Sequence, residues 1–448
     1  MTTLRERLTD LADEAPYPPD APDLWDRGRR YGRRRRAGAA AVALAVVVTI
    51  ASGVLSLAPW QEVSVQPASA ESELRLPDRV YRPSPWTPGT DDTGPAGPLV
   101  AVVETERASW TGYGSGLAGV TPEGDYVFLD LDDQTGDAVG LSPDGRHLAY
   151  WYTDPGRPEL SADGSGEPAA AGVAVLDTVT GETVREPLGG EWGVSTSILI
   201  WAGSLLWVPE WQSDEPERDE DGGGIGGVSV LRRVTAWDLA TGAKVDHESK
   251  TFLAMLPGAT ASGDRLVVSR GGRVHLVGPD GRRERVARLS GQQAGTAAID
   301  PTGTWLADLG DTDPLGDGND DAGPIRVARL PAGHDGVLTP TTLDGPMVRG
   351  LIGWRSGHEL VARRVVSGAT AYEAVDVETG SRSTLLTLDE DLGSSQVHLA
   401  ADALAAPLFD APAPPSRHDP RVVLVAGLGA AAALGALGLL LWRRRVRA

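Results

Sequence analysis

Glycine-containing turns recur at a nearly constant spacing through the middle of this chain, and that spacing limits the possible fold more than any other feature. One kind of turn precedes a β-rich run, as in residues 142–151 (SPDGRHLAYW), and the other joins two strands, as in residues 234–245 (VTAWDLATGAKV). From each turn of the second kind to the next turn of the first kind, the steps are 21, 22, 21, 22, 21 and 22 residues. The steps run from Gly124 to Gly145, Gly181 to Gly203, Gly242 to Gly263, Gly281 to Gly303, Gly336 to Gly357, and Gly380 to Asp402.

This spacing predicts an all-β propeller over residues 99–410. Apolar residues alternate on either side of the turns, which is the pattern of half-buried strands. Units of 40 to 60 residues that hold four short strands each are typical of propeller blades. Six turn pairs predict six blades. Seven blades are the alternative, because residues 73–86 could supply another strand. We expect strands from residues 396–409 to close the ring with strands near residues 98–131.

The two turn sequences resemble the WD-repeat and TolB-like propeller family. The matching segments are SPDGRHLAYW and AWDLATGAKV, and they depart from the strict WD repeat because only one Trp-Asp pair, Trp237-Asp238, is present. The Gly-His dipeptide of that repeat is missing. The resemblance implies a propeller scaffold, and it implies no particular activity because such propellers serve many unrelated functions.

Two apolar stretches, residues 37–58 and 422–442, bracket the predicted propeller and are long enough to cross a membrane as helices. Arginines lie on the terminal side of each stretch, at Arg33, Arg34, Arg35 and Arg36 and at Arg443, Arg444 and Arg445. Basic residues beside a span stay in the cytoplasm. The predicted location is therefore the plasma membrane, with both termini cytoplasmic and the propeller extracellular. The first stretch could instead be a cleaved signal, with Ala68-Ser69-Ala70 as its cleavage site.

The remaining segments are predicted from their composition. Residues 1–36 form a basic cytoplasmic leader, in which residues 3–15 carry an apolar helical stripe, and residues 443–448 form a basic tail. The leader resembles juxtamembrane leaders of actinobacterial membrane proteins, which indicates a membrane-anchored envelope form. Residues 59–98 contain eight prolines. Together with residues 411–421 they are predicted to be extended, Pro-rich stalks.

The charge of the chain excludes some classes of partner. The formal net charge is −21, and the basic ends make the central part still more acidic. Nucleic acid needs a surface of the opposite sign, so we expect no nucleic-acid partner. The chain has no cysteine, which removes disulfides and thiolate chemistry from consideration.

Four longer connections are predicted to lie on one face of the ring. They are residues 108–116, 153–172, 211–227 and 309–324, and each would follow the second strand of its blade. Loops on a rigid scaffold commonly carry recognition, so this face is the candidate binding face. Its candidate residues are Trp110, Tyr113, Trp192, Trp211, Asp214, Glu215, Glu217, Asp219, Glu220, Asp221, Asp311 and Asp313. The alternative is that these acidic segments are solvated insertions without a partner.

We predict no catalytic residue and no cofactor. The chain lacks a G-x-S-x-G elbow and an HExxH pair. Asp317, Asn319 and Asp321 begin like a calcium loop, but Ala322 and Ala328 stand where that loop needs glycine and a bidentate glutamate. A calcium site there is therefore only a weak candidate. The strand tryptophans Trp151, Trp201, Trp207, Trp237, Trp305 and Trp354 are predicted to be core wedges between blades.

These features favour a membrane-anchored propeller that binds or scaffolds an envelope protein or a cell-wall component, and that contacts the bilayer through two spans. One alternative is an envelope sensor or regulator that signals through the cytoplasmic leader. Another is a calcium-dependent envelope hydrolase or lactonase.

Overall fold

The structure is a computed structural model that falls into two compact units, Ser64–Arg417 and the two chain ends Met1–Val63 with His418–Ala448. Each unit is described by itself. The described residues are 73–154, 170–189, 193–213, 217–218, 224–225, 229–247, 258–290, 296–309, 322–331, 336–366, 369–392, 397–417 and 419–447, with Thr9, Asp13 and Arg30.

Six antiparallel meanders of four strands can be traced in the described part of Ser64–Arg417. The first contains β30 (Val397–Leu399), β3 (Ala101–Ser109), β4 (Gly112–Val120) and β5 (Tyr126–Phe128). The second contains β6 (Gln134–Leu141), β7 (His147–Thr153), β8 (Ala170–Asp177) and β9 (Thr183–Pro187). The third contains β11 (Ile200–Ala202), β12 (Leu205–Ser213), β15 (Ser229–Asp238) and β16 (Lys244–His247).

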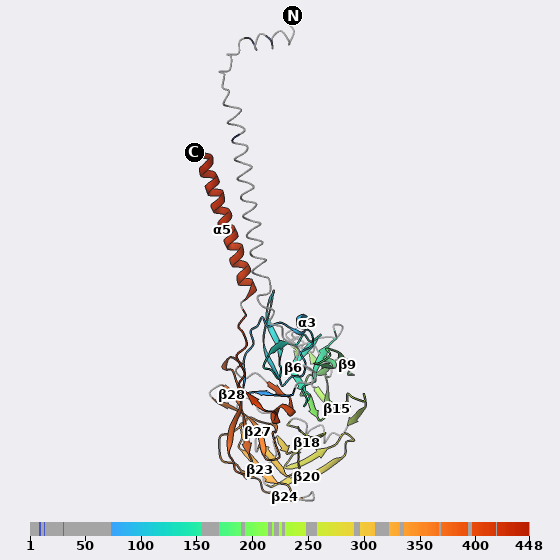
Figure 1. Cartoon of the computed structure of the whole chain (residues 1–448). Coiled ribbons are helices and arrows are strands. Elements are labelled where there is room, and N and C mark those ends of the chain that lie inside the picture. Colours follow the sequence, from blue (N-terminus) through green and yellow to red (C-terminus); the bar gives the residue numbers. More distant parts are fainter. Residues whose placement is uncertain are drawn as a thin grey trace. The chain divides into compact units, whose positions relative to one another are not determined.

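The fourth meander contains β17 (Thr260–Ser262), β18 (Arg265–Arg270), β19 (Arg273–Val277) and β20 (Arg283–Leu289). The fifth contains β21 (Ala297–Ile299), β22 (Trp305–Leu309), β23 (Ile325–Arg329) and β25 (Thr341–Thr342). The sixth contains β26 (Gly350–Trp354), β27 (Glu359–Val366), β28 (Ala369–Asp376) and β29 (Arg382–Leu388). The meanders follow one another around the unit in chain order, from β6 through β15, β20 and β23 to β28 (Figure 1). This arrangement confirms the predicted all-β, propeller-like fold.

Several short strands and helices lie outside the six four-stranded meanders. They are β1 (Leu76–Pro77), β2 (Arg79–Val80), α3 (Thr90–Thr93), β10 (Val194–Ser195), β13 (Glu217–Arg218), β14 (Gly224–Ile225), β24 (Gly336–Leu338), η1 (Glu390–Leu392), η2 (Ala401–Ala405) and β31 (Leu408–Phe409). Strand β10 pairs with both β8 and β12, so it joins the second and third meanders into one sheet.

A strand near the C-terminal end of the unit closes the first meander. Strand β30 pairs antiparallel with β3 and places Leu399 opposite Ala101 and Val397 opposite Val103. The N-terminal meander therefore receives its first strand from the C-terminal end of the unit, which confirms the predicted closure. Such closure leaves no open sheet edge between the beginning and the end of the ring.

The turn glycines have the backbone conformation that their spacing predicts. Nine of the eleven glycines that define the six steps have a positive φ: Gly124, Gly145, Gly181, Gly203, Gly242, Gly263, Gly281, Gly303 and Gly380. A side chain disfavours that region, which explains why glycine recurs there. The prediction is wrong at Gly336, which begins β24, a fifth strand that pairs in parallel with β20.

The core lies within and between the meanders. Trp151 and Trp207 are fully buried, and Trp201, Trp237 and Trp354 are at most 9% exposed. Trp305 is half-buried and packs against the core of the fifth and sixth meanders. The predicted wedge role is therefore confirmed for five tryptophans and is partial for Trp305.

Part of the predicted stalk belongs to the propeller unit instead. Within residues 59–98, Leu76 and Val80 are fully buried. Strand β1 pairs in parallel with β31, and β2 pairs in parallel with β29 as an outer fifth strand. Residues 76–80 are therefore paired strands of the unit Ser64–Arg417 and are no extended stalk. Residues 73–86 add strands to existing sheets and form no seventh meander in the described region.

The C-terminal apolar stretch forms the helix α5 (Pro420–Arg447). Its segment Pro420–Arg445 is long and apolar enough to cross a membrane, and none of it is buried. Arg443, Arg444 and Arg445 are exposed in its last turns. The first apolar stretch and Arg33–Arg36 lie outside the described residues, as do Leu4, Leu8, Leu11 and Ala15 of the leader.

Candidate binding surface

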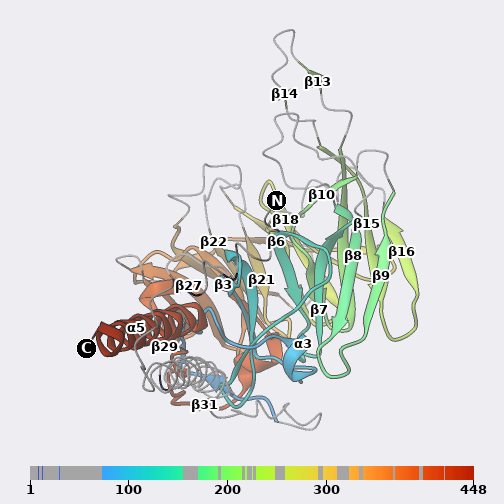
Figure 2. The same ribbon diagram turned by 90° about the horizontal axis from the view of Figure 1, so that it is seen from above.

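The strand order places the long connections at one end of the meanders. In each meander the connection between the second and third strands lies at the end opposite to the short turns that join the first to the second strand and the third to the fourth. We call this end the connection face. The connections between Thr153 and Ala170, between Ser213 and Ser229, and between Leu309 and Ile325 all belong to it. Figure 2 shows β10 and the β13–β14 hairpin at this end and α3 toward the other.

Most predicted residues of this face lie outside the described part of the chain. Those are Trp192, Asp214, Glu215, Asp219, Glu220, Asp221, Asp311 and Asp313, together with the weak calcium candidates Asp317, Asn319 and Asp321. Glu217 lies on β13, where only the backbone is described. Trp110, Tyr113 and Trp211 are described with their side chains.

A two-stranded ribbon projects from the first meander at the connection face. Strand β30 pairs only with Ala101–Val103 of β3, and β5 pairs only with Ala118–Val120 of β4. Residues 104–117 therefore continue as a β3–β4 ribbon, which we call the aromatic ribbon. Near its tip Trp110 is 62% exposed and Tyr113 is 54% exposed. The two aromatic side chains are thus exposed near the same tip, and their role in binding stays a prediction.

The segment 82–90 packs against this ribbon. The Trp86 and Trp110 rings meet edge to face, with 6.1 Å between their centroids. The Ala108 backbone N–H donates to the Pro85 carbonyl at 2.8 Å. Arg82 pairs with Glu106 at 2.6 Å, and Arg107 pairs with Asp130 at 2.5 Å. An isolated two-stranded hairpin is marginal in water, so we expect these contacts to stabilise the ribbon.

The base of the connection between β12 and β15 is held by a buried ion pair. Glu210 is 2% exposed, and its carboxylate accepts hydrogen bonds from Arg233 Nε at 2.5 Å and Gln212 Nε2 at 2.7 Å. Arg233 also donates to Asp246 at 3.1 Å. Because a buried carboxylate without partners is costly, these bonds fix the direction in which the chain enters the 214–228 connection. Trp211 follows Glu210 and is half-buried.

A cavity of about 100 Å³ lies beside this ion pair, between the second and third meanders. Lys244 contacts Glu186 across it and lies 4.9 Å from the centre of the Trp237 ring. Asp246 accepts a hydrogen bond from Thr235 at 2.7 Å. The charges in and beside the cavity are therefore engaged with one another, and their arrangement cross-links two meanders.

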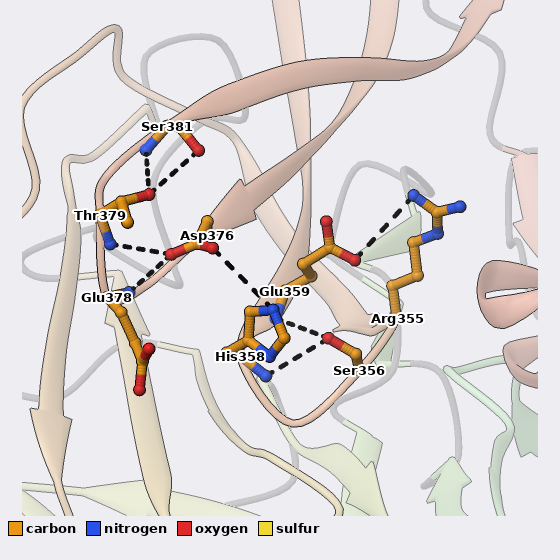
Figure 3. A network of polar contacts seen from close by, with 8 residues as sticks. All are labelled: Arg355, Ser356, His358, Glu359, Asp376, Glu378, Thr379 and Ser381. Atoms are coloured by element: carbon orange, nitrogen blue, oxygen red, sulfur yellow. Dashed lines mark hydrogen bonds and ion pairs between the residues drawn. The ribbon is translucent and has the colours of Figure 1, made fainter.

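The opposite end, which we call the turn face, carries a repeated polar turn. Figure 3 shows the copy in the sixth meander, where the Asp376 carboxylate accepts backbone N–H bonds from Glu378 at 3.0 Å and Thr379 at 2.8 Å. The Thr379 bond is the main cause of the lowered pKa of Asp376. His358 lies 3.9 Å from the same carboxylate. Asp177 and Asp238 repeat this turn in the second and third meanders.

The described region offers little for metal or acid–base chemistry. No group of three or more His, Asp or Glu residues in it could hold a metal ion. His398 on β30 has its pKa lowered to about 4 by burial, with the nearby positive charge of Arg363 adding to the shift. Asp308 is buried beside Arg326, and burial raises its pKa. Asp308 lies in the core, whereas His398 is half-buried on the closing strand.

Sequence reasoning missed the Glu210–Arg233 pair and the β10 bridge. Glu210 occupies one position of an otherwise apolar run, LLWVPEW, which is a signal of a partnered buried charge. Strand β10 has two residues, and its pairing depends on two distant strands.

Comparisons with known proteins give similarity of structure alone. Neither protein-family profiles nor curated protein sequences match this chain. Among solved structures, TolB from Acinetobacter baumannii is similar at 15% identity over 69% of each chain, with a TM-score of 0.37. An oligogalacturonate lyase in complex with manganese is similar at 14% identity over 68% of this chain and 77% of that one, with a TM-score of 0.39. Such low scores carry no argument about ligand or reaction. The propeller-like fold follows from the strand pairing, and the WD-repeat resemblance stays a prediction.

Proposed function

We propose that this chain is a membrane-anchored, six-bladed propeller of the bacterial envelope that binds a partner through its connection face. Its spans are α5 and residues 37–58, and the propeller lies outside the cytoplasm. The partner is an envelope protein or a cell-wall component. The proposal includes no enzymatic step and no cofactor.

One observation carries the proposal, namely the unequal length of the connections at the two ends of the strands. Three connections at the connection face span 16, 15 and 15 residues between the bounding strands. At the turn face the connections have at most five residues, except for the one that contains β24. A rigid scaffold with long insertions at one end is the arrangement of proteins that recognise partners through loops.

The charge of the long connections defines the partner further. Residues 211–227 contain six acids and one arginine, and residues 309–324 contain five acids and no basic residue, so each has a net charge of −5. Complementary charge guides association, and we therefore expect a basic surface on the partner.

Photo-crosslinking from two positions tests the proposal. A photoreactive residue is placed at Trp211 on the connection face or at Glu378 on the turn face of the full chain in intact cells. Position 211 should capture a distinct, basic product, and this product should disappear when the six acids of residues 211–227 are replaced by their amides. Equal capture from both positions would show that the acidic connections are solvated insertions without a partner.

The regulator alternative needs the cytoplasmic leader, whereas the binding module does not. Deleting residues 1–26 separates the two. An unchanged cellular phenotype after this deletion favours the binding module. Hydrolysis of a lactone panel by the purified chain would instead favour the hydrolase alternative.

A further inference from the structure

The aromatic ribbon differs in chemistry from the acidic connections that share its face. Residues 107–116 read RASWTGYGSG and contain no carboxylate, although the whole chain has 62 acidic residues. Trp110 and Tyr113 are more than half exposed among small side chains, and an added Cβ at Gly112 or Gly114 would meet nothing within 4 Å. The tip is therefore an exposed, mostly neutral aromatic surface.

The ribbon also lies near the place where the chain leaves the propeller unit. The Ser84 hydroxyl donates to the Arg417 carbonyl at 3.4 Å. Pro85 and Trp86 follow Ser84 directly and contact the ribbon at Ala108 and Trp110.

The few residues between this contact and α5 limit how far Trp86 can lie from the start of that helix. Two residues lie between Arg417 and Pro420, where α5 begins. The three Cα-to-Cα steps from Arg417 to Pro420 span at most about 10 Å when fully extended. With the Ser84 contact and the two residues to Trp86 included, the backbone at Trp86 lies within about 25 Å of the first residue of α5.

We propose that the aromatic ribbon inserts the Trp110 and Tyr113 rings into the interfacial layer of the phospholipid bilayer that α5 spans. The inference rests on the membrane anchor of the proposed function. Tryptophan and tyrosine favour the headgroup region because their rings are apolar and carry one polar group. Trp86 packs behind Trp110 and widens the apolar surface. The ribbon is thus assigned to lipid, and the acidic connections remain the partner surface.

Together with the two proposed spans, this contact would fix which side of the propeller unit faces the bilayer. The connection between β12 and β15 would then keep a constant orientation toward the envelope.

Spin labels on the full chain in phospholipid nanodiscs test the inference. The chain has no native cysteine, so Thr111→Cys, Leu434→Cys and Val337→Cys each give one label. Thr111 lies at the ribbon tip, Leu434 in the middle of α5, and Val337 is 66% exposed on β24. Immersion depth is measured as the ratio of collisions with oxygen to collisions with a water-soluble nickel chelate.

We expect a high ratio at position 434, an intermediate ratio at 111 and the aqueous value at 337. Adding Trp110→Ser and Tyr113→Ser should shift the ratio at 111 to the aqueous value. The matched control, Val184→Ser with Val245→Ser, removes two exposed apolar side chains elsewhere and should leave position 111 unchanged.

Two outcomes separate the failure of this inference from the failure of the anchor. An aqueous value at 111 with a high ratio at 434 would overturn the ribbon contact and leave the anchor intact. An aqueous value at 434 would overturn the anchor and the ribbon contact together. The Thr111 label keeps all three aromatics, so its result does not depend on whether the serine variants fold.

Discussion

His398 gives a quantitative test of ring closure, because it lies on the closing strand β30. Its side chain is half-buried, and the loss of solvation there together with the positive charge of Arg363 lowers the pKa of His398 from 6.5 to about 4. In the unfolded chain this histidine takes up its proton near pH 6.5. Below pH 6.5 the unfolded chain binds a proton at His398 more tightly than the folded protein does. Lowering the pH therefore favours unfolding.

The size and sign of the effect follow from the two pKa values. One pKa unit corresponds to about 1.4 kcal/mol, so the free energy of unfolding should fall by about 2 kcal/mol at pH 5 and about 3 kcal/mol at pH 4 relative to pH 7.5. The full stability contribution is present above pH 6.5 and is lost as pH falls from 6.5 toward 4. His398→Gln has no titrating group at this site and should lack this part of the loss.

Urea unfolding of the full chain in detergent, followed by tryptophan fluorescence between pH 7.5 and pH 4, measures the difference. The contribution of carboxylates is the same in both proteins. It cancels when the pH dependence of His398→Gln is subtracted from that of the wild type. His358→Gln is the control, because the His358 side chain is 53% exposed on the turn face. If the free energy of unfolding fell equally with pH for wild type and His398→Gln, the reasoning would be refuted. That result would show that His398 is solvated and that β30 does not close the ring as described.

Three further predictions concern the same scaffold. Trp207→Ala should lower the free energy of unfolding by about 3–5 kcal/mol, because it empties a fully buried site; a loss below about 1 kcal/mol in urea unfolding would contradict that core. Arg326→Met should cost about 3–5 kcal/mol by leaving Asp308 buried without its partner, and an unchanged urea midpoint would show that Asp308 is not held this way. Cysteines at positions 101 and 399 should form a disulfide on oxidation, detected by gel mobility, whereas moving one cysteine two residues along β30 should prevent it; equal yields would argue against the described register.

The propeller-like scaffold could be predicted from the sequence, because the residues that define its turns are close together in the chain. The turn at Asp177 and Gly181 uses one carboxylate and one positive φ, and the same four-residue spacing recurs at Asp238 and Asp376. Closure through β30 could be predicted as well, because a ring needs a strand from the C-terminal end of the propeller to complete the first sheet.

Other parts of the structure depend on long-range pairing that leaves no periodic signal. Strand β2 has two residues in a proline-rich segment, and only its parallel partner β29 defines it. The same holds for β24, which crosses from the fifth meander to the edge of the fourth. At the candidate surface, exposure could be predicted for Trp110 but not for Trp211, whose burial follows from the β10 strand beside it.

The topology is the claim on which the proposed function depends most, and cysteine labelling in intact cells tests it directly. Val337→Cys lies on the propeller and Arg445→Cys lies in the last turn of α5, in a chain without other cysteines. A membrane-impermeant maleimide should label position 337 in intact cells, and position 445 only after lysis. Protection of position 337 until lysis, or labelling of position 445 from outside, would contradict an external propeller anchored by α5.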